Sequence, residues 1–213
     1  MNNIFGYTKE MLEEYFFNIN QKKFKAIQIY DWLYKKYIYD FKLFSNIKKE
    51  VIDNLINDFS VDFIKIEKVL EGKDVKKFLF RLLDGEKIEA VLMKHNYGLS
   101  VCVSSQVGCN MGCRFCESGR LKKIRNLETY EIVEQILLIQ KYINRRIDSV
   151  VLMGIGEPFD NYDNIIKFIK IINDAHGLAI GSRHITVSTC GLVPKIYEFS
   201  NLDLQVNLPI SLH

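Results

Sequence analysis

The 213-residue chain is 48% hydrophobic and 26% charged, with 12 Gly and 3 Pro, which excludes a disordered or collagen-like protein. Its net charge of +3 permits an anionic partner without requiring one. No apolar stretch reaches the roughly 18–20 residues of a membrane span, and the start of the chain lacks signal-peptide features, so we expect a cytoplasmic protein. Basic residues cluster at Lys22-Lys23, Lys35-Lys36, Lys122-Lys123 with Arg125, and Arg145-Arg146.

The first sixty residues predict a small helical accessory domain, residues 1–60. Thr8 is a candidate cap for a first helix, a second is expected over residues 22–39, and a third after Ser45 or Asn46. The aromatic residues of this region lie at helical spacing, so we interpret them as core rather than as an RNA-stacking surface.

Strands are expected next, in a β-hairpin linker region over residues 61–104. The runs 75–83 and 87–93 flank a turn that contains Asp84-Gly85, which is a strong hairpin signal. A third run, 99–104, leads into a cluster of cysteines.

From residue 128 apolar strands alternate with helices, which predicts parallel β/α units and an α/β fold class. Thr129 is the expected cap of one helix, Asn161 precedes a second, and a brief third follows Pro194. Strands are expected over 149–153, 184–188 and 204–212. A parallel strand needs cover on both faces, so a chain that stops after such a strand predicts an incomplete barrel over residues 105–213.

Cysteines at positions 109, 113 and 116 form a C-x3-C-x2-C segment. Three thiolates on one loop can hold three corners of a cubane iron–sulfur cluster and leave the fourth iron open to a substrate or cofactor. A structural zinc site would need a fourth ligand, for which His95 and Cys102 are poorly spaced. The spacing favours a [4Fe–4S] cluster on Cys109, Cys113 and Cys116 over zinc.

This spacing, with Phe115 before the last cysteine, resembles the radical S-adenosylmethionine (SAM) superfamily. The flanking segments resemble its RlmN/Cfr family of RNA methyltransferases: 102–109, 125–127, 153–158, 161–163, 186–191 and 210–213. The helical region resembles that family's accessory domain through residues 24–36. The resemblance implies a partial radical SAM (β/α) barrel, a [4Fe–4S] cluster and SAM as cofactors, and radical methylation of adenine.

The resemblance also assigns cofactor contacts. Gly156 and Glu157 match positions at the SAM amino group, and a glycine there would let the backbone approach the ligand. Ser188 and the segment Ser211-Leu212-His213 match further SAM-contacting positions, at the ends of expected strands, where parallel α/β folds place ligands. Without the resemblance, Gly-x-Gly-Glu-Pro is an ordinary strand-to-helix turn.

Two catalytic roles are implied in the same way. Glu89 matches a position assigned as a proton acceptor, and Cys102 matches the family's resolving cysteine, which releases the product through a disulfide. The family's methyl-carrying cysteine has no counterpart before residue 213, so the chain on its own is expected to be inactive. Cys190 is interpreted as a small buried side chain.

Expected partners are 23S rRNA, with transfer RNA as a possible further substrate, and an electron-donor protein. Lys122, Lys123 and Arg125 are candidate phosphate contacts. Pro158 resembles RlmN, the C2 methyltransferases, more than Cfr, which methylates C8. A non-catalytic RNA-binding remnant and a zinc-binding structural module remain as alternatives.

Overall fold

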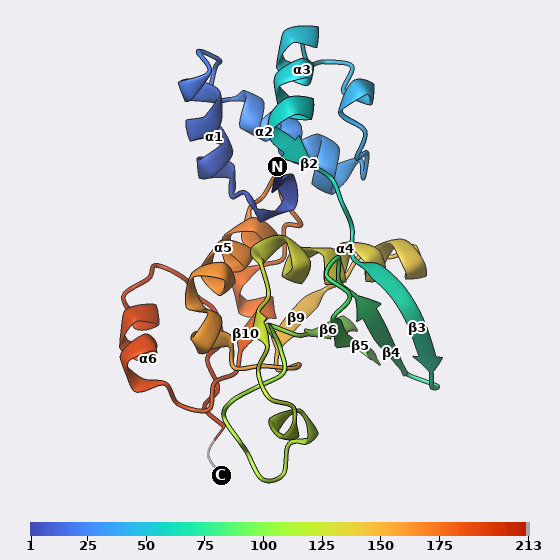
Figure 1. The fold of residues 1–213 in the computed structure, drawn as a ribbon, viewed down its shortest axis with the longest axis vertical. Coiled ribbons are helices and arrows are strands. Elements are labelled where there is room, and N and C mark those ends of the chain that lie inside the picture. Colours follow the sequence, from blue (N-terminus) through green and yellow to red (C-terminus); the bar gives the residue numbers. More distant parts are fainter. Residues whose placement is uncertain (212–213) are drawn as a thin grey trace.

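In the computed structural model, which describes residues 1–211, a helical N-terminal part adjoins an α/β part (Figure 1). The helical part consists of η1 (Ile4–Gly6), α1 (Lys9–Asn18), α2 (Lys25–Tyr30), η2 (Asp31–Lys35), η3 (Phe41–Leu43) and α3 (Lys49–Asp58). Its two ends are joined by a parallel pair of short strands, β1 (Asn2–Asn3) and β2 (Phe59–Ser60).

The expected helices are present, with revised limits. Thr8 caps α1, because its hydroxyl accepts a hydrogen bond from the Met11 N–H at 3.3 Å. The helix expected over residues 22–39 begins at Lys25, widens into the π-helical turn η2, and ends before Tyr37, whose φ is +54°. The third helix begins at Lys49, with Lys48 in the cap position instead of Ser45 or Asn46.

Six strands form one continuous sheet in the order β10-β9-β6-β5-β4-β3. They are β3 (Lys65–Glu71), β4 (Val75–Arg81), β5 (Lys87–His95), β6 (Gly98–Val103), β9 (Ser149–Leu152) and β10 (Ile185–Val187). The pairs from β3 to β6 are antiparallel, and β6, β9 and β10 are parallel. The segment expected as a hairpin linker therefore supplies four of the strands of the same sheet that carries the β/α units.

One face of this sheet is buried and the other is partly open. Val101, Val150 and Ile185 belong to the core on the buried face, where α4 (Thr129–Ile143) packs on β6 and against α5 (Tyr162–Asn173). Cys102 and Val151, one residue further along their strands, are only half-buried, because successive side chains point to opposite faces. A last helix, α6 (Val193–Ser200), follows β10.

Two expectations for the β/α part need correction. The cap of α4 is Glu128, which forms a capping box with Glu131, and Thr129 is the first helical residue. The strand expected over 204–212 is reduced, in its described part, to the bridges Thr186–Asn207 and Thr189–Ile210. The described residues make an α/β fold without a closed barrel. None of their helices is long and apolar enough to cross a membrane.

Candidate cluster and cofactor site

The three cysteines of the C-x3-C-x2-C segment lie on one loop whose base is clamped by a short antiparallel pair. β7 (Gln106–Val107) precedes the loop and β8 (Arg125–Asn126) follows it. Inside the loop the Cys109 N–H donates to the Leu121 carbonyl at 2.8 Å, and the Cys116 N–H donates to the Cys113 carbonyl at 3.1 Å. These bonds fix a local segment that presents three half-buried free thiols.

The donor set fits a cluster better than a single ion. Among residues 1–211, no three His, Cys, Asp or Glu side chains are placed to hold one metal ion. In a cubane cluster each cysteine binds a different iron atom, so its thiolates lie farther apart than the ligands of one zinc ion. Burial raises the pKa of the Cys109 thiol, with smaller contributions from Cys113 and Cys116, and bound iron would favour the thiolates.

The thiols open into a cavity of about 330 Å³ that Gly156, Glu157, Ser188 and Ser211 also line. Gly156 and Glu157 follow β9 and Ser188 follows β10, at the carboxyl ends of the parallel strands, and Ser211 follows the bridge residue Ile210. The Ser188 and Ser211 hydroxyls lie 3.0 Å apart, within hydrogen-bonding distance. The structure thus brings together the cysteines and four of the expected cofactor contacts. Leu212 and His213 lie outside the described residues.

The glycine at position 156 has a structural reason that is independent of the expected ligand contact. Its φ is +107°, and an added Cβ would lie 2.6 Å from the Gln106 Cβ and 2.7 Å from the Ser105 Oγ. The turn after β9 therefore packs directly on the segment after β6, and space for this contact requires glycine whether or not a ligand is bound.

Glu157 is buried, and protein donors hold its carboxylate in place. One oxygen accepts hydrogen bonds from the Thr189 hydroxyl at 2.7 Å and the Phe159 N–H at 3.0 Å. The other accepts from the Cys190 N–H at 2.9 Å, and the Cys190 thiol also hydrogen-bonds to this carboxylate. The carboxylate is thus oriented at the wall of the cavity, where it can receive a cationic amino group.

Glu89 and Cys102 do not line this cavity but lie on the open face of the sheet. The register pairs Cys102 with Val91 on β5, two residues from Glu89, and with Val151 on β9, two residues from Met153, which does line the cavity. Glu89 is ion-paired with Lys77 at 2.8 Å. Burial raises the pKa of the Cys102 thiol.

Cys190 differs from its expected description as a small buried side chain. It is half-buried and lines the cavity beside the Glu157 carboxylate. Burial, followed by the charge of Glu157, raises the pKa of the Cys190 thiol to about 12. At neutral pH this thiol is therefore protonated.

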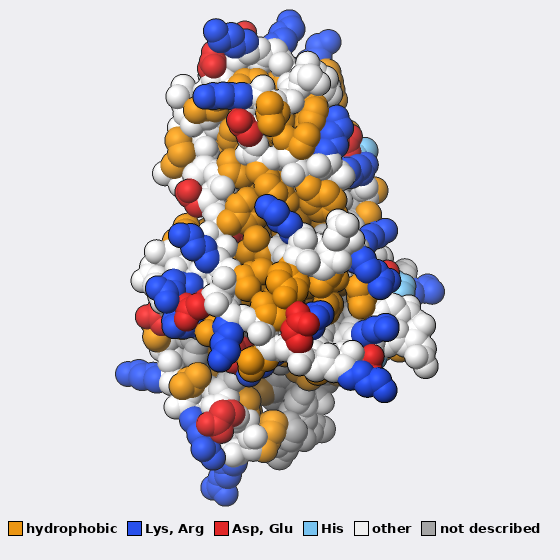
Figure 2. Space-filling model, turned by 90° about the vertical axis from the view of Figure 1, so that its right-hand side faces the viewer, with side chains coloured by type: hydrophobic (Ala, Val, Ile, Leu, Met, Phe, Trp, Pro, Cys, Tyr) orange, Lys and Arg blue, Asp and Glu red, His pale blue; other side chains and the backbone are white. Residues whose placement is uncertain are grey.

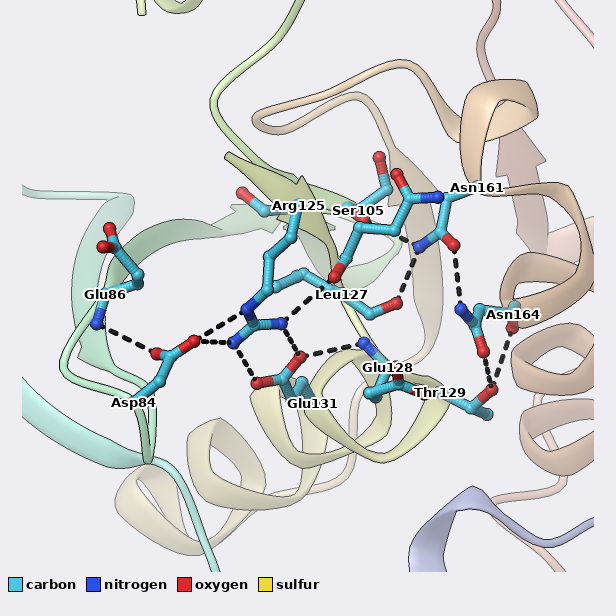
Figure 3. A network of polar contacts seen from close by, with 12 residues as sticks. Asp84, Glu86, Ser105, Arg125, Leu127, Glu128, Thr129, Glu131, Asn161 and Asn164 are labelled. Carbon is cyan, nitrogen blue, oxygen red and sulfur yellow. Dashed lines mark hydrogen bonds and ion pairs between the residues drawn. The ribbon is translucent and has the colours of Figure 1, made fainter. Parts of the chain in front are cut away.

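Two of the residues proposed as phosphate contacts form ion pairs with carboxylates of the same chain. Lys123 pairs with Asp160 at 2.7 Å. The Arg125 guanidinium forms two bonds to the Glu131 carboxylate, at 2.7 and 2.8 Å, and a further 2.7 Å bond to Asp84 (Figure 3). A phosphate contact at Lys123 or Arg125 would therefore compete with these carboxylates, whereas Lys122 is exposed and forms no ion pair within residues 1–211.

Two side-chain amides that no sequence pattern marked as functional support the site. Gln106 is fully buried. Its side-chain Oε1 accepts a hydrogen bond from the Glu157 N–H at 2.9 Å, and its side-chain Nε2 donates to the Asn126 and Asp160 side chains. The Asn161 amide donates to the carbonyls of Ser105 and Leu127 (Figure 3). Gln106 and Asn161 both lie within segments that carry the family resemblance, which is the feature of the sequence that could have indicated their role.

Comparison with known proteins agrees with this arrangement. Residues 2–61 match the family model for the ribosomal RNA large subunit methyltransferase N-terminal domain, and residues 103–212 match the radical SAM superfamily. A crystal structure of a radical SAM methyltransferase from Sphaerobacter thermophilus superimposes with a TM-score of 0.88 at 33% identity, over 100% of this chain and 64% of the other. The chain therefore belongs to the radical SAM superfamily.

Its curated relatives narrow the assignment. The chain is 54% identical over 99% of its length to a probable dual-specificity RNA methyltransferase RlmN of Streptococcus thermophilus, covering 56% of that protein. It is also 54% identical to the corresponding RlmN of Spiroplasma citri, over 100% of this chain and 63% of the relative. The relationship to RlmN is confirmed, and the chain spans about three-fifths of the length of these relatives.

Proposed function

We propose that the full-length protein methylates C2 of an adenine in 23S rRNA, and in transfer RNA as a second substrate. The observation that carries the proposal is the single cavity into which the three-cysteine loop, the Gly156-Glu157 turn and Ser188 all open. We propose Cys109, Cys113 and Cys116 as ligands of a [4Fe–4S] cluster, and Gly156, Glu157, Ser188, Ser211, Leu212 and His213 as the SAM-binding residues.

The chemistry of adenine explains why such a site is needed. Adenine C2 is an electrophilic, non-acidic carbon, so no general base near neutral pH could make it a nucleophile for direct attack on SAM. When bound, the cluster and SAM supply a 5′-deoxyadenosyl radical, and radical addition to the ring avoids that barrier. The RNA must present the base unstacked, at a cost of a few kcal/mol.

The residues of this chain have defined tasks in the proposal. Glu157, held by Thr189, Phe159 and Cys190, orients the cationic end of SAM. On the open face of the sheet, Glu89 accepts the proton and Cys102 acts as the resolving thiol. The Lys77 ammonium lies 2.8 Å from the Glu89 carboxylate.

The proposal keeps the division into an accessory domain (1–60), a strand region (61–104) and an incomplete barrel (105–213), acting in the cytoplasm with an electron-donor protein. It requires the part of the protein that its relatives have beyond these residues. To test it, the full-length protein is expressed in cells that lack the native enzyme, and their ribosomal and transfer RNA is digested for mass spectrometry. We expect 2-methyladenosine. Formation of 8-methyladenosine would move the protein to Cfr-type activity, and an unmodified RNA would support a non-catalytic binding role.

The cluster can be tested separately. After anaerobic reconstitution we expect bound iron and sulfide, a brown colour, and loss of both in the Cys109/Cys113/Cys116→Ala variant. Cys190→Ala is the matched control, because Cys190 lines the same cavity but does not belong to the C-x3-C-x2-C segment. Equal iron content in wild type and triple variant would contradict the cluster assignment, and stoichiometric zinc in a colourless protein would favour a structural metal site.

A further inference from the structure

A second concave region lies at the end of the sheet opposite to the cluster cavity. The cluster cavity follows the end of β9, whereas this region surrounds the loop that leads into β9 at Ser149. It consists of a cavity of about 440 Å³ between the helical part and the end of α4, and a neighbouring cavity of about 180 Å³ at the β3–β4 turn. The two cavities adjoin at Arg145, which lines both. The pair is called the basic groove here and is defined by Tyr37, Tyr39, Lys73, Lys94, Lys141 and Arg145.

The groove is strongly positive. Lys73, Lys94, Lys141 and Arg145 are all exposed, whereas Asp74 is the one acidic residue among the described residues that line the two cavities. None of these four cations takes part in an ion pair within residues 1–211. In this respect they differ from Lys123 and Arg125 beside the cluster loop, whose charges are matched by carboxylates.

Two tyrosines form the wall that faces the cations. Tyr37 is 45% exposed, and its backbone has a φ of +54°, which is uncommon for a bulky residue. Its hydroxyl accepts a hydrogen bond from the Gln140 Nε2 at 3.4 Å, and Tyr39 lines the same cavity. The partly exposed Tyr37 ring therefore lines the same cavity as the unpaired cations Lys141 and Arg145.

Figure 2 shows the face of the molecule on which α4 ends and β3 lies. Hydrophobic side chains gather in a band across its middle, with Lys and Arg side chains around that band. A membrane surface would favour a protruding apolar side, whereas here the aromatic residues line a hollow between two parts of the fold. Aromatic rings with unpaired cations are the combination that binds unstacked bases and backbone phosphates.

We propose that the basic groove binds the RNA substrate at a distance from the modified base, with phosphates on Lys73, Lys94, Lys141 and Arg145 and one unpaired base against Tyr37. The inference rests on the proposed function for its choice of RNA. α4 joins the two ends of the β/α part and, with 15 residues, is about 22 Å long, a span that a folded RNA can bridge. Contacts in the groove would thus increase the affinity for RNA and fix its position on the protein without contacting the modified base.

The test compares two triple variants with the same change in charge. Lys73→Gln/Lys141→Gln/Arg145→Gln removes cations of the groove, and Lys22→Gln/Lys42→Gln/Lys48→Gln removes exposed lysines of the helical part. Binding of a fluorescein-labelled RNA hairpin with a single-stranded loop is measured by anisotropy at several salt concentrations. For the groove variant we expect affinity to fall on the order of tenfold or more, and the slope of log K against log salt to lose about 2 units. The control variant is expected to change little.

Tyr37→Asn tests the stacking contact, since Asn tolerates the left-handed backbone. We expect about tenfold weaker binding of the hairpin at an unchanged salt slope. Circular dichroism and cluster content establish that each variant is folded. Equal losses in the two triple variants would overturn the inference, as would equally tight and equally groove-dependent binding of anionic vesicles. Iron content and methylation are measured separately. A negative result for RNA binding in the groove would therefore not contradict the proposed reaction.

Discussion

At the scale of single residues, the site depends on a backbone contact that only glycine permits. Gly156 and Gly191 have nearly the same φ, +107° and +108°, but a Cβ on Gly191 would meet nothing within 4 Å, whereas one on Gly156 would meet Gln106 and Ser105. The backbone strain of an alanine is therefore matched at the two positions, and the steric clash exists at only one.

We predict that Gly156→Ala lowers the free energy of unfolding by about 2–3 kcal/mol more than Gly191→Ala, because overpacking adds to the shared strain of roughly 1–3 kcal/mol. Urea denaturation of the two variants, followed by circular dichroism, measures the difference. Equal destabilisation would mean that the turn after β9 can move away from Gln106, and that the close contact does not fix the site.

At the scale of elements, Arg125 connects three parts of the fold. Its guanidinium joins β8 to the first turn of α4 through Glu131 and to the β4–β5 turn through Asp84 (Figure 3). The side chain of Glu131 is 2% exposed and that of Asp84 is 43% exposed. Because screening by water weakens exposed pairs, the two bonds of one arginine should differ widely in their contribution to stability.

Arg125→Leu is expected to destabilise the protein by about 3–5 kcal/mol, since it leaves the buried Glu131 carboxylate without its cation. Asp84→Asn, which removes only the exposed pair, should cost about 0–1 kcal/mol. Thermal unfolding of both variants checks the order. A loss of similar size in the two would show that the β4–β5 turn, rather than the first turn of α4, depends on Arg125.

The same elements explain what the sequence could and could not predict. The hairpin of β4 and β5 was predictable because Asp84-Gly85 is a local turn signal and its strands alternate. β3 was missed because its residues, KIEKVLE, are half-buried at most and show no strong apolar alternation. The cysteine loop is likewise local, whereas the support of Glu157 by Gln106 and Thr189 joins residues 51 and 32 positions apart, which no spacing pattern reveals.

At the scale of the whole molecule, one buried carboxylate joins the helical part to the α/β part. Glu134 of α4 is fully buried; one of its oxygens accepts from the Ile64 N–H at 2.9 Å and the other from the Asn3 Nδ2 at 3.0 Å. Asn3 and Ile64 flank the helical part at its start and just beyond its end. Burial raises the pKa of Glu134 to about 8. The two hydrogen bonds lower this pKa, whereas the charges of Glu131 and Asp62 raise it further.

This pKa predicts that the contribution of Glu134 to the stability of the folded protein becomes smaller as the pH rises. Between the unfolded value of about 4.5 and the folded value of about 8, the folded protein binds more protons at Glu134 than the unfolded chain does, so stability from this residue declines across that window. Relative to Glu134→Gln, which cannot ionise, the wild type should lose on the order of a few kcal/mol between pH 5 and pH 8. Urea unfolding of both proteins at pH 5, 6.5 and 8 isolates the contribution of Glu134, because the other titrating groups are common to the pair. A difference that stays constant over this range would show that Glu134 is ionised in the folded protein, held by Ile64 and Asn3 alone.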